Sequence, residues 1–310
     1  MPGEAFPGGP PGRTSDRGGS LHSRAMTTID ELVRLVPPPT EPVDARGDWS
    51  EVEAALGLEL PADFKTLVER YGRGQFVDLI TPLTPFGAHD LLIQRAQQLL
   101  GRERSFREKY PDECPYPFYP EPGGLLEWAG TDNGDSLCWL TEGEPDSWRV
   151  VVWNPRSVAY DAHDIGAVEF LHGWLSGRIT TPILPGEVEA SPWFEPFLER
   201  EHVYIRLSES ESPYHERLRI LRDALAPTAD RGSYSDEDDH GDEDDARQDH
   251  FAATDLGWLL TYETVYGHQI RVAFPPGDGE RARVALFDAA RRMGCQVLST
   301  TTRLGEPVWT

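Results

Sequence analysis

The pattern of apolar positions predicts a short helix over residues 49–56. Trp49, Val52 and Leu56 recur at helical spacing, with mostly polar or small residues between them, so one face of the segment is apolar. Gly57 follows directly, and glycine commonly ends a helix because it adopts the left-handed conformation at little cost. The segment is therefore expected to be an amphipathic helix with a defined end.

A second helix is predicted a few residues later. Pro61 has the fixed φ of a first helical position, and Asp63 lies where the helix dipole favours a negative charge. Gly72 marks the end of this helix. Its apolar face consists of residues at positions i, i+3, i+4 and i+7, namely Phe64, Leu67, Val68 and Tyr71.

Three strand-like runs follow, over residues 125–130, 136–141 and 148–154. Asn133 and Gly134 join the first two runs, and this dipeptide is favoured in tight hairpin turns. The third run is apolar at successive positions, as in a central strand that is buried on both faces. The hairpin and the third run are expected to form the centre of a sheet.

Further elements surround this centre. Residues 28–36, 89–110 and 168–179 have helical periodicity, and residues 76–80 and 158–161 read as short strands. The sequence therefore predicts an α+β domain with a mixed β-sheet flanked by helices. Near the C-terminus, the order strand, strand, helix, strand predicts a small ββαβ module, with elements over residues 258–265, 269–274, 280–293 and 296–302.

Two segments differ sharply from these in composition. Residues 1–25 are rich in Gly, Pro, Ser and Arg, and eight acidic residues lie between Asp236 and Asp245, so both regions are expected to be disordered. We therefore expect a disordered tail over residues 1–25, a first domain over 26–185 and a helical extension over 186–225. An acidic disordered linker over 226–250 and a small α+β module over 251–310 complete the predicted organisation.

The helix pair and the hairpin, in this order, resemble the SUKH superfamily, whose members include bacterial immunity proteins and yeast regulators of cell-wall assembly. The resemblance covers roughly residues 27–185. The matching residues in the helix pair are Trp49, Glu53, Leu56, Gly57, Leu60, Pro61, Asp63, Phe64, Leu67, Tyr71, Gly72 and Gly74. The second matching segment is the strand, turn and strand of residues 126–140, which contains Asn133, Gly134 and Trp139.

The net charge of the chain indicates which classes of partner it can bind. The 310 residues include 53 Asp and Glu against 29 Lys and Arg, which gives a formal net charge of −24. This charge repels phosphate backbones and favours basic proteins, so a nucleic-acid partner is not expected. The three cysteines lie far apart, and no apolar run is long enough to span a membrane. We therefore expect a cytoplasmic protein without disulfides.

Motifs for catalysis are missing from the sequence. It contains no H-E-x-x-H, no G-x-S-x-G, no phosphate-binding loop and no dinucleotide fingerprint, so no catalytic residue, cofactor or metal is predicted. Asp132 and Asp135 flank the hairpin turn and could form an acid–base pair or bind a metal. Carboxylates beside an Asn-Gly turn more commonly bond their own backbone, so the metal-dependent enzyme is the least favoured alternative.

The resemblance implies a non-catalytic protein-binding module, and in particular an immunity protein that binds and neutralises a cognate bacterial toxin with a basic surface. A regulatory scaffold, closer in role to the yeast relatives, is the alternative. We expect the partner to contact an acidic and aromatic rim on loops beside the sheet. The predicted rim consists of Asp132, Asp135, Glu142, Glu144, Asp146, Tyr116 and Tyr119.

Overall fold

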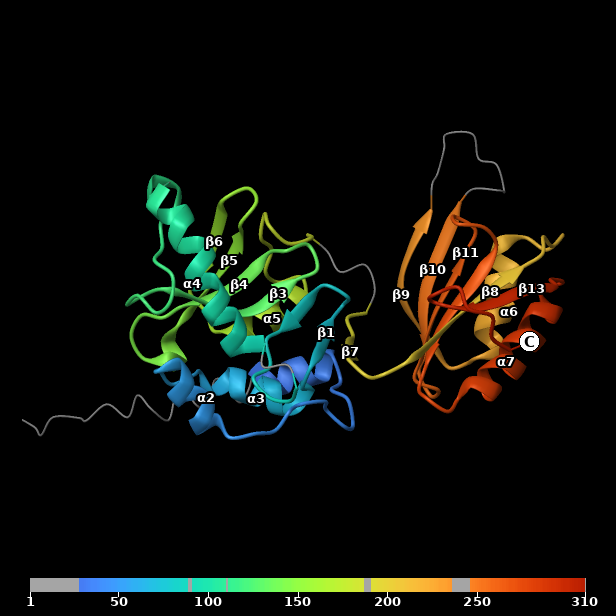
Figure 1. Cartoon of the computed structure of the whole chain (residues 1–310), viewed down its shortest axis with the longest axis horizontal. Coiled ribbons are helices and arrows are strands. Elements are labelled where there is room, and N and C mark those ends of the chain that lie inside the picture. The colour runs from blue at the N-terminus through green and yellow to red at the C-terminus, as the bar shows by residue number, and fades with distance from the viewer. Residues whose placement is uncertain (1–27, 89–90, 110, 187–190, 236–245, 310) are drawn as a thin grey trace, which may run out of the picture. The chain divides into compact units, whose positions relative to one another are not determined.

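The computed structural model describes residues 28–88, 91–109, 111–186, 191–235 and 246–309 (Figure 1). The chain divides into two compact units, Met1–Gly186 and Glu187–Thr310. The predicted tail over residues 1–25 lies outside the described residues. Both units combine helices with antiparallel sheets, so the α+β class is confirmed.

The first unit contains the predicted helix pair, α2 (Trp49–Leu56) and α3 (Ala62–Tyr71), preceded by a helix over residues 28–35. The apolar face of α3 is buried, as its periodicity predicts. Two further helices of this unit lie later in the chain, α4 (Leu91–Lys109) and α5 (Ala167–Leu175). The helix predicted over residues 89–110 therefore forms wherever the structure describes it, since residues 89, 90 and 110 lie outside the described ranges.

The sheet of the first unit is a meander in the order β6-β5-β4-β3-β2-β1. Each of these neighbouring pairs is antiparallel, where a mixed sheet was expected. Strands joined by short connections, as in β1–β2, β3–β4, β4–β5 and β5–β6, return antiparallel alongside the preceding strand. The connection from β2 to β3 is long and contains α4, yet this pair is antiparallel as well. The strands are β1 (Gly74–Phe76), β2 (Ile80–Pro82), β3 (Leu125–Thr131), β4 (Ser136–Leu140), β5 (Arg149–Asn154) and β6 (Ala159–His163).

The single strand predicted over residues 76–80 is wrong, because the chain reverses there. Val77 and Asp78 both have positive φ, 48° and 52°, and Leu79 N donates to the Phe76 carbonyl at 3.0 Å. Two consecutive left-handed residues form the turn that connects hairpin strands. The β-branched Val77 is unusual in such a turn, so residue types alone did not indicate a turn at this position.

Aromatic side chains attach α3 to the sheet. Phe64 meets the ring of Trp139 edge-on, with centroids 4.8 Å apart, and Trp128 lies 6.4 Å away. All three rings are fully buried. At the other end of α3, Tyr71 donates its hydroxyl to the Val36 carbonyl at 2.6 Å. The core thus lies between the helix pair and the central strands, as the apolar pattern predicts.

The second unit has a six-stranded antiparallel sheet in the order β13-β8-β12-β11-β10-β9. Helices α6 (Tyr214–Ala224) and α7 (Gly279–Arg292) lie together on one side of it and share its core (Figure 1). The order β8, α6, β11, β12, α7, β13 is that of a split βαβ, ferredoxin-like arrangement, with β9 and β10 inserted after α6. Its strands are β8 (Glu201–Leu207), β9 (Thr228–Ser235), β10 (Arg247–Ala253), β11 (Trp258–Glu263), β12 (Gln269–Phe274) and β13 (Val297–Thr302), and a short strand β7 (Phe194–Pro196) precedes them in the chain.

Two predicted boundaries in this region are wrong. Residues 226–250 were expected to be a disordered linker. Instead, β9 covers residues 228–235 and β10 begins at Arg247, and residues 236–245 between them lie outside the described ranges. Residues 186–225 were expected to be helical, yet β8 lies between β12 and β13. Alternating buried residues on β8, namely Val203, Ile205 and Leu207, carry the period-2 signal of this strand. The predicted ββαβ elements do form, but within this larger unit.

The two glycines that end the helix pair allow a matched test of the local backbone. Gly57 and Gly72 have φ of 70° and 67°, but a Cβ at Gly72 would lie 2.2 Å from the Val43 carbonyl oxygen, whereas one at Gly57 would meet no atom within 4 Å. We expect Gly57→Ala to cost about 1 kcal/mol of unfolding free energy. Gly72→Ala should cost about 3 kcal/mol or more, because strain and a backbone clash add. Urea unfolding of both variants measures this difference, and equal losses would contradict it.

Candidate functional site

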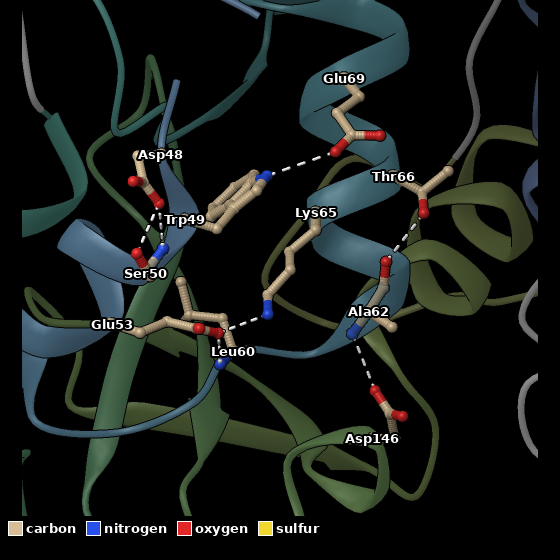
Figure 2. Close-up of polar contacts among 10 residues, drawn as sticks. All are labelled: Asp48, Trp49, Ser50, Glu53, Leu60, Ala62, Lys65, Thr66, Glu69 and Asp146. Atoms are coloured by element: carbon tan, nitrogen blue, oxygen red, sulfur yellow. Dashed lines mark hydrogen bonds and ion pairs between the residues drawn. The ribbon is translucent and has the colours of Figure 1, made fainter. Parts of the chain in front are cut away.

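Carboxylates from distant segments cap two helices at one end of the first unit. Asp146, in the short 3-10 helix η2 (Pro145–Ser147), accepts a hydrogen bond from Ala62 N at 2.8 Å, at the first residue of α3 (Figure 2). Asp63 in turn accepts from Val168 N at 3.2 Å, at the second residue of α5. The free N–H groups of a helix N-terminus and its dipole both favour such anions. The two caps therefore tie α3 to the β4–β5 connection and α5 to α3.

Asp63 is the more constrained of the two carboxylates. It also accepts from the Phe64 backbone N–H at 2.7 Å, and a Cβ at Gly166 would lie 2.9 Å from its Oδ2. Burial raises the pKa of Asp63, and the negative charge of Asp146 acts in the same direction. The hydrogen bonds that the Val168 and Phe64 backbone N–H groups donate to Asp63 lower its pKa, but the net shift is upward. A carboxyl group whose pKa is raised by folding contributes stability at low pH that is lost as pH rises through the folded-state pKa. Ionised Asp63 thus carries an electrostatic cost in the folded chain.

A cavity of about 190 Å³ lies beside these caps. Its volume is below the roughly 300–1,000 Å³ of typical small-molecule pockets. Four carboxylates belong to its lining, and none of its described lining residues is Lys, Arg or His. The acidic lining residues are Asp63, Asp146, Asp164 and Glu169, and the aromatic ones are Trp139 and Trp148. We call this region the capped end.

Polar side chains in and beside α2 and α3 hold the helix pair together (Figure 2). Asp48 caps α2 by accepting from Ser50 N at 2.8 Å. Glu53 accepts from Leu60 N at 2.8 Å and forms an ion pair with Lys65. Burial alone would raise the pKa of Glu53, but the hydrogen bonds from Lys65 and Leu60 lower it overall. These side chains are therefore occupied in fixing the α2–α3 connection.

Trp49 has a similar role within the helix pair. Its indole N–H donates to Glu69 Oε1 at 3.3 Å, and its ring meets Phe86 edge-on with centroids 4.8 Å apart. An aromatic ring with a satisfied polar end packs well at such a junction. The motif tryptophan is thus explained by packing.

The predicted rim does not form one surface. Asp132 and Asp135 lie at the β3–β4 turn, whereas Glu142, Glu144 and Asp146 follow the opposite end of β4. The five residues of β4 span about 17 Å at ~3.4 Å per residue. Successive loops of a meander alternate between the two ends of the sheet, so the acidic residues divide into two groups. Only the second group lies at the capped end.

Asp135 is also not at the surface. It is 3 % exposed, and its carboxylate accepts from the Thr131 hydroxyl at 3.2 Å. Asp132 is exposed and accepts from Gln75 Nε2 at 2.6 Å. Bonding within the turn, which the sequence favoured for these two carboxylates, is found for Asp135, whereas Asp132 bonds to Gln75 on β1. We therefore exclude Asp135 from the contact face.

Tyr116 and Tyr119 are half-buried. The ring of Tyr116 contacts that of Tyr160, with centroids 5.7 Å apart. Tyr119 donates its hydroxyl to the Leu56 carbonyl at the end of α2, and burial raises its pKa. Both tyrosines thus have packing roles, and Tyr119 connects the loop before β3 to α2.

The sequence interpretation missed Asp63, Asp164 and Glu169 as members of the site. Asp63 was recognised only as a favourable residue for its own helix, because its bond to Val168 spans 105 residues. A signal for the other two was present, since acidic residues flank Gly166 at the start of an apolar helix. Among the described residues, Asp146 and Asp164 have no cationic partner.

Three further observations concern metal ligands, thiols and membrane spans. These contain no group of three or more His, Cys, Asp or Glu side chains arranged to hold a metal ion. Cys138 is buried within β4, and burial strongly raises the pKa of its thiol, which disfavours the reactive thiolate. None of the helices in the described ranges is both long and apolar enough to cross a bilayer.

Comparison with known protein families matches residues 46–171 to the family model SUKH_6, described as SMI1-KNR4 cell-wall. This segment of the chain is a SUKH-superfamily domain. The match starts just before α2 and ends within α5, so it contains most of the capped end, while the second unit lies outside it. Searches of curated proteins and of solved structures gave no match. SUKH domains are generally non-catalytic, and the match supports an interaction module.

The role of Asp63 in the SUKH domain is testable by substitution. Asp63→Ala removes the acceptor for both Val168 N and Phe64 N, and we expect a loss of about 2–3 kcal/mol in unfolding free energy. Asp63→Asn keeps one oxygen acceptor and should lose less. Glu142→Ala, at an exposed position, serves as the control and should change stability by less than about 0.5 kcal/mol. Equal stability of Asp63→Ala and the control in urea unfolding would refute the capping role.

Proposed function

We propose that this chain is an immunity protein whose SUKH domain binds and neutralises a cognate bacterial toxin. The observation that carries the proposal is the capped end of the domain, where exposed carboxylates gather without a basic residue in the described cavity lining. The exposed carboxylates are Asp146 and Asp164 in the cavity lining, together with Glu142 and Glu144 earlier on the β4–β5 connection. A partner with a basic surface would place positive charges opposite these carboxylates.

The charge of the whole chain supports the same partner. A formal net charge of −24 accelerates encounter with a cationic protein at low ionic strength, and salt weakens this effect. Fast association suits a protein that must block a toxin before it acts. The partner we propose is therefore a toxin with a basic surface.

Neutralisation would be steric and electrostatic. The capped end would cover the active cleft of the toxin, and the complex would persist without turnover. The SUKH domain supplies a rigid base for this contact, because its helix N-termini and the β4–β5 connection are tied together by Asp63 and Asp146. A pre-organised surface loses less conformational entropy on binding than a mobile one.

A regulatory scaffold is the second candidate, and the second unit favours it. This unit has its own hydrophobic core and lies outside the SUKH match. A separate folded unit offers a further contact surface, as a protein that brings several partners together requires. A single dominant partner would support immunity, whereas several unrelated partners would support the scaffold.

Affinity purification of the tagged chain from its native host tests the proposal. We expect one dominant basic protein, and we expect its recovery to fall by about tenfold or more when four carboxylates are neutralised by Glu142→Gln, Glu144→Gln, Asp146→Asn and Asp164→Asn. The matched control changes the charge equally in the second unit, through Glu209→Gln, Glu211→Gln, Asp255→Asn and Glu306→Gln. This control should retain the partner.

The captured protein must also behave as a toxin. Expressed alone in a bacterial host, it should arrest growth, and co-expression of the wild-type chain should restore growth. Growth that is unaffected by the captured protein would contradict the immunity role. Equal recovery by both charge variants would show that the capped end is not the contact face.

A further inference from the structure

The sheet of the second unit carries its two helices on one face. Both α6 and α7 pack on the side of the hydrophobic core (Figure 1). Successive side chains of a strand point to opposite faces of a sheet, and β8 buries every second residue in this core. His202, Tyr204 and Arg206 of β8 therefore lie on the face opposite the helices, which we call the outer face.

The strand register brings cationic side chains together on the outer face. Arg271 of β12 and Thr301 of β13 both lie directly opposite Tyr204, one on each side of β8. Arg303 follows Thr301 by two residues, so it comes beside His202 on the same face. Burial lowers the pKa of His202, and the charge of Arg303 acts in the same direction. The outer face thus gathers His202, Arg206, Arg271 and Arg303.

The charge of the outer face is opposite in sign to that of the chain, whose formal net charge is −24. Among the described strand residues of this unit, alternation places one carboxylate on the outer face, that of Glu263, and it is fully buried. Arg206 and Arg303 are exposed, and neither has a hydrogen-bond or ion-pair partner among the described residues. The charged side chains that solvent reaches on these strands are therefore cationic.

Arg271 is held in place on this face by a buried carboxylate and two aromatic rings. One oxygen of Glu263 accepts from Arg271 Nε at 2.6 Å, and the other accepts from Gln248 Nε2 at 2.8 Å. The guanidinium carbon lies 5.7 Å from the ring centroid of Tyr204 and 5.6 Å from that of Tyr266, within the range of cation–π contacts. The Arg271 side chain is nevertheless 32 % exposed. A ligand can therefore reach a guanidinium whose position is already fixed, which reduces the entropy lost on binding.

We propose that the outer face binds a short acidic segment of a partner protein, whose carboxylates pair with Arg206, Arg271 and Arg303. Arginine binds carboxylates through paired N–H groups, and the exposed ring of Tyr266 adds a packing surface. A long polyanion such as a nucleic acid would also meet the negative charge of the rest of the chain. A short segment interacts mainly with charges within about 8 Å at physiological ionic strength. This contact is separate from the immunity role, because the second unit lies outside the SUKH match.

NMR titration of the full chain with short peptides tests this contact. The probe is acetyl-Gly-Asp-Glu-Asp-Glu-Gly-amide, and the neutral control has the corresponding amides, acetyl-Gly-Asn-Gln-Asn-Gln-Gly-amide. We expect backbone amide shifts over residues 202–206, 269–273 and 301–303, with a dissociation constant below about 1 mM. The neutral peptide should bind about tenfold more weakly or less tightly still. A uridine decanucleotide, titrated in the same way, serves as the nucleic-acid probe.

Variants of the chain separate the outer face from general charge effects. Arg206→Gln with Arg303→Gln should weaken binding of the acidic peptide about tenfold, and Tyr266→Ala should weaken it about threefold. Arg271 is kept, because its loss would leave the buried Glu263 without its cation. The matched control, Arg291→Gln with Arg292→Gln, removes the same charge from exposed positions of α7 and should change binding by less than about twofold.

Any of four results would overturn the inference: no shifts with the acidic peptide, shifts confined to residues outside the outer face, equal binding of the neutral peptide, or equal losses in the Arg206–Arg303 variant and its control. Tighter binding of the oligonucleotide at the same residues would contradict the choice of an acidic protein segment. None of these measurements involves the capped end or the captured toxin. A failure of this inference therefore leaves the proposed function in place, and the reverse also holds.

Discussion

The architecture of this SUKH domain depends on carboxylates that satisfy helix N-termini from other parts of the chain. Asp146 caps α3 across 84 residues, and Asp63 caps α5 across 105 residues. Unsatisfied N–H groups at a helix start need acceptors, and the helix dipole makes an anion the favourable one. Because both caps lie at the same end of the sheet, the interactions that assemble the fold also concentrate negative charge there.

The same carboxylates carry both the helix caps and the partner contact that we propose. Burial and the nearby Asp146 raise the pKa of Asp63, so the ionised group is held at some energetic cost. A positive charge beside it would lower that cost, which is consistent with the basic partner that we propose. The remaining motif residues, such as Glu53 and Trp49, are engaged in bonds within the helix pair. The contact proposed above therefore uses residues around the motif and not the motif itself.

The sequence predicted the local structure better than the site. Helical spacing located α2 and α3, and the Asn133-Gly134 dipeptide located the hairpin, because these signals are contained within a few residues. The strand β8 and the strands β9 and β10 were missed, since an acidic run and a polar flank outweighed short alternating patterns. The capped end was only partly predicted: Asp146 was included for its loop position, but its proximity to Asp63 follows from tertiary packing. The same packing buried Asp135 and separated Asp132 from the other rim residues.

The central claim is that partners contact the capped end. Hydrogen–deuterium exchange of the full chain, free and saturated with the captured protein, tests it most directly. The account predicts slower exchange in the complex over residues 61–63, 142–148 and 164–169, with little change at the β3–β4 turn. Protection confined to residues 131–135 or to the second unit would contradict it.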